Sequence, residues 1–152
     1  MNKLNMTAIA AAISIVFSTG VMAQSMSKDT YKATADRITT EYTADKNRCE
    51  PLFGNMKDIC IAEAKGKEKI AKAELEASYE PTTKNHYEAQ VAKAEAGYAV
   101  ANEKCDDKVG NDKDICVKEA KAVETSIKAD AEAKMKISEA NQTANEKSAE
   151  AG

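Results

Sequence analysis

The 152-residue chain is rich in charge but carries a net charge of only −3, with 22 Lys and Arg against 25 Asp and Glu. This balance provides neither the basic surface of a nucleic-acid-binding protein nor the high net charge of a disordered chain. After residue 23, Leu, Ile, Val and Phe supply only 15 of 129 residues against 23 alanines, so we expect a helical protein with a thin core that needs covalent support.

The first 23 residues have the pattern of a secretory signal peptide. Lys3 provides a basic start, an apolar run covers residues 8–17, and residues 21–23 place small side chains where a signal peptidase cuts. The apolar run is shorter than the roughly 18 residues that a membrane span needs. We therefore expect cleavage after Ala23, secretion through the inner membrane of a bacterium, and a periplasmic protein without a membrane span.

A twelve-residue unit with a cysteine at each end occurs twice, 56 residues apart, at residues 49–60 and 105–116. Around it, residues 28–78 and 84–134 align without a gap at 19 identities in 51 positions, which indicates a duplication. Each copy has the length and periodicity of one helical hairpin. The sequence therefore predicts an all-α domain over residues 24–137, built from two tandem hairpins.

Before the first cysteine of each unit, a stripe of residues recurs at steps of three and four, which is typical of one face of an α-helix. Because the stripe ends at the cysteine, the cysteine is expected to face the same partner. The positions are Tyr31, Ala35, Ile38, Tyr42, Asp45 and Cys49, then Tyr87, Val91, Ala94, Tyr98, Ala101 and Cys105. We interpret the four tyrosines as bulky members of an alanine core; in an alternative interpretation they line a groove that binds unfolded polypeptide.

Between the cysteines of each unit, a Gly-Asn step predicts that one helix ends and another begins. The glycine suits the left-handed position just past a helix end. The asparagine is predicted to cap the next helix, with an aspartate three residues on as its acidic partner. These residues are Gly54, Asn55 and Asp58 in the first copy and Gly110, Asn111 and Asp114 in the second.

After the second cysteine, a stripe of mostly small residues is predicted to pack back on the first helix of the same hairpin. Small side chains allow the close approach that a disulfide needs, since its Cα atoms lie about 5.5 Å apart. The stripe comprises Ile59, Ala62, Gly66, Ile70, Ala73 and Ala77, matched by Ile115, Ala122, Ala129 and Ala133.

Residues 80–83, Glu-Pro-Thr-Thr, break the chain between the copies and offer a threonine cap for the third helix. The short link permits either an up-down four-helix bundle or an elongated pair of hairpins joined by a kink. Short connections favour antiparallel neighbours, so we expect the bundle. Residues 138–152 have no apolar stripe and are predicted to form a polar disordered tail.

The cysteines are interpreted as two structural disulfides, Cys49 with Cys60 and Cys105 with Cys116. Four cysteines allow three pairings, and the duplication favours the local one because a copied unit carries its own bridge. Secretion agrees with this, since disulfides persist in oxidising compartments. A four-cysteine metal site and a redox-active pair are the alternatives, but both usually use shorter spacings than the ten intervening residues found here.

Other catalytic or cofactor chemistry has little support in the sequence. His86 is the only histidine, the carboxylates alternate with lysines at helical spacing, and there is no glycine-rich phosphate-binding loop. We expect no enzymatic activity, no cofactor and no metal.

The signal peptide, the SKDTYKA start, the twin GN-x-KDIC-x-x-EAK segments and the K-AELEA-Y-PT link resemble a cysteine-repeat family of small secreted proteins of Gram-negative bacteria. Members of this family are often labelled cell-envelope biogenesis or TolA-like proteins. The resemblance covers nearly the whole chain after the signal peptide and implies a role in the cell envelope.

Three functions are consistent with these features. The leading hypothesis is a non-enzymatic structural or protein-interaction module of the periplasm. The second is a small ATP-independent chaperone that uses the tyrosine stripes, and the third is a thiol-redox or metal-stress protein. The alanine-rich stripes could also pair between chains, which leaves a homodimer open.

Overall fold

The computed structural model describes residues 26–151, and the predicted signal peptide lies outside the described residues. This part of the chain is all α-helical, as predicted, and contains four helices. They are α1 (Lys28–Cys49), α2 (Asn55–Tyr79), α3 (Thr83–Cys105) and α4 (Gly110–Glu150).

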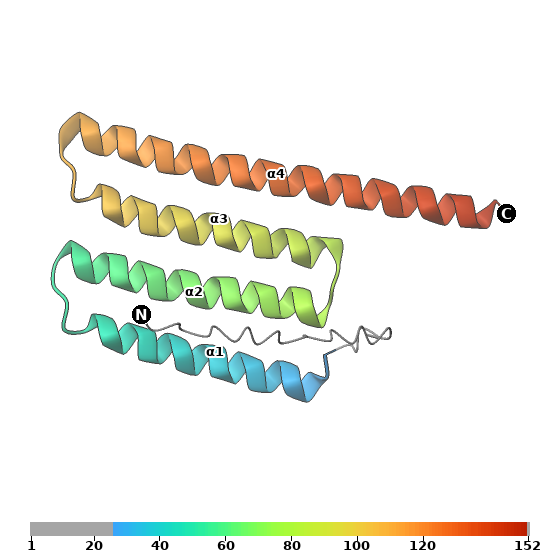
Figure 1. Cartoon of the computed structure of the whole chain (residues 1–152), viewed down its shortest axis with the longest axis horizontal. Coiled ribbons are helices and arrows are strands. Elements are labelled where there is room, and N and C mark those ends of the chain that lie inside the picture. Colours follow the sequence, from blue (N-terminus) through green and yellow to red (C-terminus); the bar gives the residue numbers. More distant parts are fainter. Residues whose placement is uncertain (1–25, 152) are drawn as a thin grey trace, which may run out of the picture.

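The helices run antiparallel to their neighbours and lie side by side in one layer (Figure 1). Packing joins α1 to α2, α2 to α3, and α3 to α4, with no contact between other pairs of these helices. The up-down order is therefore confirmed, but the four helices form an open layer and do not close into a bundle. The two cysteine corners lie at one end of the layer, and the α2–α3 link lies at the other.

The inner helices α2 and α3 bury small residues on two opposite sides. In α2, Ala62 and Gly66 face α3, whereas Ala64 lies on the α1 side. Residues two apart on an α-helix point in nearly opposite directions, so alternating alanines suit a helix with a neighbour on each side. Among the buried apolar residues described, only Ile38 and Leu75 are large aliphatics, which confirms a thin core.

Side-chain caps begin α1 and α3. The hydroxyl of Ser27 accepts a hydrogen bond from the backbone N–H of Thr30 at 3.1 Å. Thr82 accepts the corresponding bond from the N–H of Asn85, also at 3.1 Å, which is the threonine cap expected after Pro81. The third helix therefore restarts just after the proline, and the chain reverses there.

The prediction of a disordered tail over residues 138–152 is wrong for the described part of that segment. Helix α4 is 41 residues long and continues to Glu150, past the ends of the other helices (Figure 1). Ala, Glu, Lys and Gln are strong helix formers and favour a helix without an apolar stripe. Towards its C-terminal end, α4 contacts α3 through Ser138 and Gln142, whose side chains each lie 3.4 Å from the hydroxyl of Thr83.

Candidate functional site

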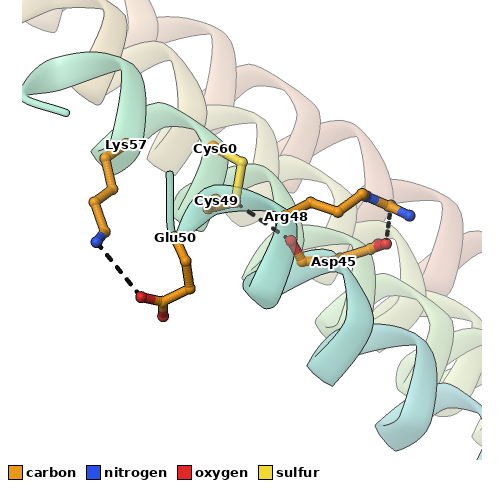
Figure 2. The surroundings of a disulfide bond; sticks show 6 residues. All are labelled: Asp45, Arg48, Cys49, Glu50, Lys57 and Cys60. Atoms are coloured by element: carbon orange, nitrogen blue, oxygen red, sulfur yellow. Dashed lines mark hydrogen bonds and ion pairs between the residues drawn. A yellow bond between two sulfur atoms is a disulfide. The ribbon is translucent and has the colours of Figure 1, made fainter. Parts of the chain in front are cut away.

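Both predicted disulfides are present, and each joins the end of one helix to the beginning of the next. Figure 2 shows the first of them, between Cys49 and Cys60. The Cα atoms of Cys49 and Cys60 are 5.7 Å apart, as are those of Cys105 and Cys116. The two corners therefore have the same geometry, as expected for a copied unit. They indicate an oxidising, extracytoplasmic environment.

The bonded cysteines leave no thiolate for a metal or a redox reaction in this oxidised form. Cys49 and Cys105 are only 1% exposed, so attack on their sulfur atoms from solvent is hindered. Within residues 26–151, no group of three or more His, Cys, Asp or Glu side chains could hold a metal ion. His86 is exposed at the start of α3.

An ion pair crosses each corner at the same place in the repeat. Lys57 lies 3.8 Å from Glu50 in the first copy, and Lys113 lies 3.0 Å from Asp106 in the second. Figure 2 also shows Arg48 paired with Asp45 one turn before Cys49. These pairs are solvent-exposed for the most part and add little to stability beyond the disulfides.

The glycines of the corners have the predicted backbone freedom but not the predicted position. Gly54 and Gly110 both have φ of 56°, a region that residues with a Cβ rarely adopt. They lie at the beginning of α2 and α4, several residues after Cys49 and Cys105 end the preceding helices. Their role is to turn the chain into the second helix, not to end the first.

The predicted asparagine caps are wrong. Neither α2 nor α4 has a side-chain cap bond, and their N-cap residues are Gly54 and Val109. Asn55 is the first residue of α2, and its amide donates a 2.8 Å hydrogen bond to the backbone carbonyl of Glu103, near the end of α3. The same carbonyl accepts the backbone N–H of Asp106 at 3.0 Å, and the additional bond from Asn55 ties the two copies together.

Asp58 stands in the first turn of α2, where a negative charge is favourable, but no capping bond links it to Asn55. Asn111 and Asp114 occupy the matching exposed positions in α4. A helix beside α4 would be needed to give Asn111 the kind of partner that Asn55 has.

The four tyrosines lie half-buried at the seams between helices, in agreement with the core interpretation. Tyr31 packs against Tyr79 with ring centroids 4.6 Å apart and donates a hydrogen bond to Glu76, which raises the pKa of Tyr31. Tyr98 receives the ammonium of Lys121 at 4.9 Å from its ring centroid.

Tyr42 lines the small space between α1 and α2. Tyr87, on α3, lies beside residues of α2 and also beside residues of α4. Tyr31 and Tyr42 lie at the α1–α2 seam, whereas Tyr87 and Tyr98 contact α4, so the four tyrosines do not line one common groove.

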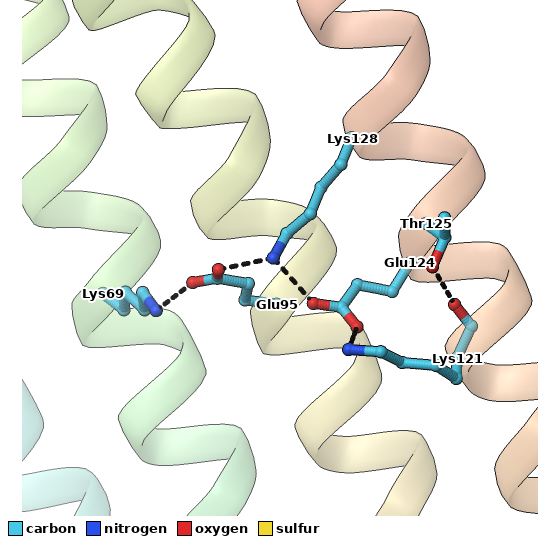
Figure 3. A network of polar contacts seen from close by, with 6 residues as sticks. All are labelled: Lys69, Glu95, Lys121, Glu124, Thr125 and Lys128. Atoms are coloured by element: carbon cyan, nitrogen blue, oxygen red, sulfur yellow. Dashed lines mark hydrogen bonds and ion pairs between the residues drawn. The ribbon is translucent and has the colours of Figure 1, made fainter.

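A chain of charged side chains crosses α2, α3 and α4 (Figure 3). Glu95 on α3 pairs with Lys69 of α2 and with Lys128 of α4, the latter at 2.6 Å. Lys128 also lies 2.8 Å from Glu124, which pairs with Lys121 at 2.7 Å. Glu124 is only 4% exposed, so its two lysine partners compensate a charge removed from water.

These contacts change proton affinities in the direction expected for favourable pairs. Hydrogen bonds from Lys121 and Lys128 lower the pKa of Glu124 despite its burial. Hydrogen bonds from Lys128 and Lys69 lower the pKa of Glu95, and those two glutamates raise the pKa of Lys128. Because each acidic group is matched to a lysine, the arrangement favours a structural role over general acid-base catalysis.

An open groove of about 630 Å³ lies between α2 and α3 on one surface of the layer. Charged side chains of both signs form its rim. The apolar part of its lining consists of Gly66, Ile70, Ala71, Ala96, Gly97, Val100 and Ala101. A methyl group added at Gly97 would meet no atom within 4 Å, so this part of the groove is open to a ligand.

The small-residue stripe of α2 faces the next hairpin, contrary to the prediction. Ala62, Gly66 and Ala73 lie against α3, and a methyl group on Gly66 would come within 2.9 Å of the Cβ of Ala96. The side of α2 that packs on α1 instead carries Cys60, Ala64, Ala71 and Leu75. Extending helical steps from Cys60, which must face α1, would have identified the correct side.

Within the described part of the chain, the matching stripe of α4 is uncovered, since α4 packs on α3 alone. We define the α4 outer face as this stripe together with three large aliphatic residues, of which Val123 and Ile127 extend it onto the surface of the layer towards α3, as their equivalents Lys67 and Ala71 do towards α1. Its members are Ile115, Ala122, Val123, Ile127, Ala129, Ala133 and Ile137. Val123 and Ile137 are 59% and 61% exposed. Sequence reasoning missed Val123, Ile127 and Ile137, although the four-residue spacing of the first two is a helical signal.

The opposite edge of the layer is polar. We define the α1 outer face as the exposed residues that point away from α2. Their side chains are small, polar or charged. They are Ala33, Asp36, Arg37, Thr40, Ala44, Asn47 and Arg48. The two edges therefore differ in character although both belong to helices with one neighbour.

No protein-family model, curated protein or solved structure matches the chain. None of the helices in residues 26–151 has the length and apolar content needed to cross a membrane. The fold and its surfaces define a small disulfide-bonded helical protein whose most distinctive surface is the α4 outer face.

Proposed function

We propose that the protein is a non-enzymatic structural and protein-interaction module of the bacterial cell envelope, located in the periplasm after cleavage behind Ala23. The disulfide corners support an extracytoplasmic location, and the signal-like sequence supports the route. Cell fractionation and N-terminal sequencing test this location. A mature chain beginning at Gln24 in the periplasmic fraction is expected, and an uncleaved chain in the cytoplasm would contradict it.

The observation that carries the proposal is the α4 outer face. Four large aliphatic residues on one helix are exposed by 40% or more, in a protein that buries mainly alanine. Burying apolar surface is favourable by about 25 cal/mol per Å², so an exposed aliphatic stripe is a typical protein-binding surface. A stapled layer with one apolar edge would present that surface in a fixed geometry.

Site-specific crosslinking in intact cells tests the proposal. A photoreactive amino acid at Val123 is expected to capture a protein partner, while the same amino acid at Lys46, an exposed residue of α1 away from the outer face, is expected to capture none. Equal capture at both positions, or none at Val123, would count against an interaction role for α4.

The groove between α2 and α3 favours a second candidate function, an ATP-independent chaperone. Its lining is aliphatic, in place of the tyrosines first considered, and it could hold an apolar segment of an unfolded protein. The purified protein would then slow aggregation of an unfolded client at stoichiometric ratios.

Gly97 offers a matched pair of variants for this second candidate. Because nothing lies within 4 Å of an added methyl group, Gly97→Leu is expected to fill the groove without disturbing the fold, while Gly97→Ala leaves most of it open. Loss of client protection in Gly97→Leu alone supports the chaperone function. Equal protection by both variants and by the unaltered protein would place client binding elsewhere.

A further inference from the structure

The α2–α3 contact shows how this repeat binds the next one. Helix α2 presents Ala62, Gly66 and Ala73 to α3, with the closest approach at Gly66 and Ala96. Helix α4 is the copy of α2, and its corresponding face has no neighbouring helix among residues 26–151. The face of α4 that is equivalent to the α3-binding face of α2 is therefore uncovered.

Polar contacts fix the register between α2 and α3. Lys93 lies 2.7 Å from Glu74, and Lys104 lies 3.5 Å from Glu63. Asn55 adds its hydrogen bond to the carbonyl of Glu103. A further ion pair joins Lys69 to Glu95. These contacts run along most of the seam and define which residues of the two helices lie opposite each other.

Three of these four contacts keep their chemistry at the matching positions of α1 and α4. Shifting each residue by the 56-residue repeat places Arg37 opposite Asp130 and Arg48 opposite Glu119, so both pairs keep a cation on one helix and a carboxylate on the other. Asn111 keeps the amide donor and would lie opposite the backbone carbonyl of Asn47.

The Lys69–Glu95 pair becomes Thr125 opposite Thr39, which is uncharged and compatible. Since α1 and α4 form the two separate edges of one layer, these residues can meet only between molecules.

We propose that α4 of one molecule docks on α1 of a second copy in the way that α2 docks on α3, which gives a head-to-tail array. Such an interface joins two different surfaces, so each added copy leaves one edge of each kind available and the array stays open. This proposal names a partner for the interaction module described above and rests on that function.

Several matching positions differ between the intermolecular contact and the internal one. Lys118 replaces Ala62, one of the residues that α2 presents to α3, and Asp36 replaces the buried Ala92 of α3. Ala122 replaces Gly66 at the closest approach and faces Thr40 in place of Ala96, so the helices must sit farther apart. Val123 and Ile127 replace Lys67 and Ala71, which line the α2–α3 groove, and add apolar surface there. We therefore expect reversible association that is weaker than the internal packing.

Sedimentation of the purified full mature protein over a range of concentrations tests the array. The average mass is expected to rise past that of a dimer, whereas a symmetric α4–α4 pair would stop at two copies. A protein that stays monomeric at millimolar concentration, or a mass that levels off at the dimer, would overturn the proposal.

Charge-reversal variants test the register. Arg37→Glu and Asp130→Arg are each expected to weaken association about tenfold, because attraction is replaced by repulsion at one pair. Mixing the two variants restores opposite charges at every junction and should restore assembly. Lys46→Glu makes the same change of charge on α1 away from the outer face and should assemble normally.

No recovery in the mixture, or an equal effect of Lys46→Glu, would overturn the docking mode.

A photoreactive amino acid at Ala129 separates this proposal from the broader function. Coupling to an α1 peptide of a second copy supports the array, and coupling to an α4 peptide overturns it. Capture of a different envelope protein would overturn the array while leaving the interaction function intact.

Discussion

The two copies of the repeat share the same disulfide corner but place their second helices in different surroundings. Helix α2 lies between α1 and α3, so both of its sides are covered. Helix α4 has α3 on one side and solvent on the other, and it exposes Val123 and Ile137. The disulfide corner therefore determines how one hairpin folds, whereas the neighbouring copy determines which faces of the second helix are buried.

The largest effect is expected from removing the disulfide of one copy at a time. Replacing both cysteines of either pair with serine is expected to lower the free energy of unfolding by about 3 kcal/mol, because each disulfide closes a loop of the same length. Urea denaturation followed by circular dichroism measures the effect. Unchanged midpoints in both variants would contradict a stabilising role, and unequal losses would show that packing differs between the corners.

Gly66 and Ala122 occupy the same place in the two copies and test whether the small-residue stripe is buried in only one. Gly66→Leu is expected to cost about 2 kcal/mol, because even a methyl group would come within 2.9 Å of the Cβ of Ala96. Ala122→Leu should change stability by less than about 0.5 kcal/mol at an exposed site. Equal losses, measured by thermal unfolding of dilute protein, would contradict the single-layer arrangement.

Glu68 and Glu124 are also equivalent, but only Glu124 is nearly fully buried and has two lysine partners. Glu124→Gln is expected to cost about 1 to 2 kcal/mol at neutral pH, since hydrogen bonds to a charged group are lost. Glu68→Gln removes one exposed ion pair and should cost less than about 0.5 kcal/mol. A larger effect at Glu68 would be inconsistent with the charge chain across α2, α3 and α4.

The charge chain also predicts how stability depends on pH. The lowered pKa values of Glu95 and Glu124 mean that their stabilisation is complete above the ordinary glutamate pKa of about 4.3 and is lost as pH falls through their folded-state values. The raised pKa of Lys128 gives stabilisation below about 10.4 that is lost at higher pH.

Urea midpoints measured across pH should therefore fall at both extremes, and Glu124→Gln should flatten the acidic side. An acidic limb that is the same in the variant and in the unaltered protein would assign that limb to other carboxylates.

The smallest expected effect comes from the asparagines of the two corners. Asn55→Ala removes the hydrogen bond to the carbonyl of Glu103 and is expected to cost about 1 kcal/mol. Asn111→Ala should be close to neutral in dilute monomeric protein. If Asn111→Ala proved as costly as Asn55→Ala under those conditions, both asparagines would have to act within their own helices, as helix caps do.

Local sequence signals predicted the helices and the disulfide pairing well. The stripe from Tyr31 to Cys49 identified the packed side of α1, and the duplicated cysteine unit identified both bridges. These features depend on residues close in sequence, where helical periodicity and chain reversal leave few alternatives.

The predictions for Gly66 and Asn55 were wrong because each residue could contact either of two neighbouring segments. Gly66 belongs to a small-residue stripe that could pack on either side of α2, and periodicity alone does not name the partner. Asn55 has the right residue type for a cap, but a helix carbonyl from the other copy lay within reach of its amide. The helical tail of α4 was missed because the absence of an apolar stripe was given more weight than high helix propensity.

The placement of both corners at one end of the layer has a mechanical consequence. Helix α1 begins and α4 ends on the opposite side, which has no covalent links between helices beyond the chain itself (Figure 1). Tension applied between residues 26 and 151 would separate the outer helices from their neighbours gradually, one turn at a time. Each separation would stop at a disulfide, so the stretched molecule would retain two closed corners from which the layer could form again.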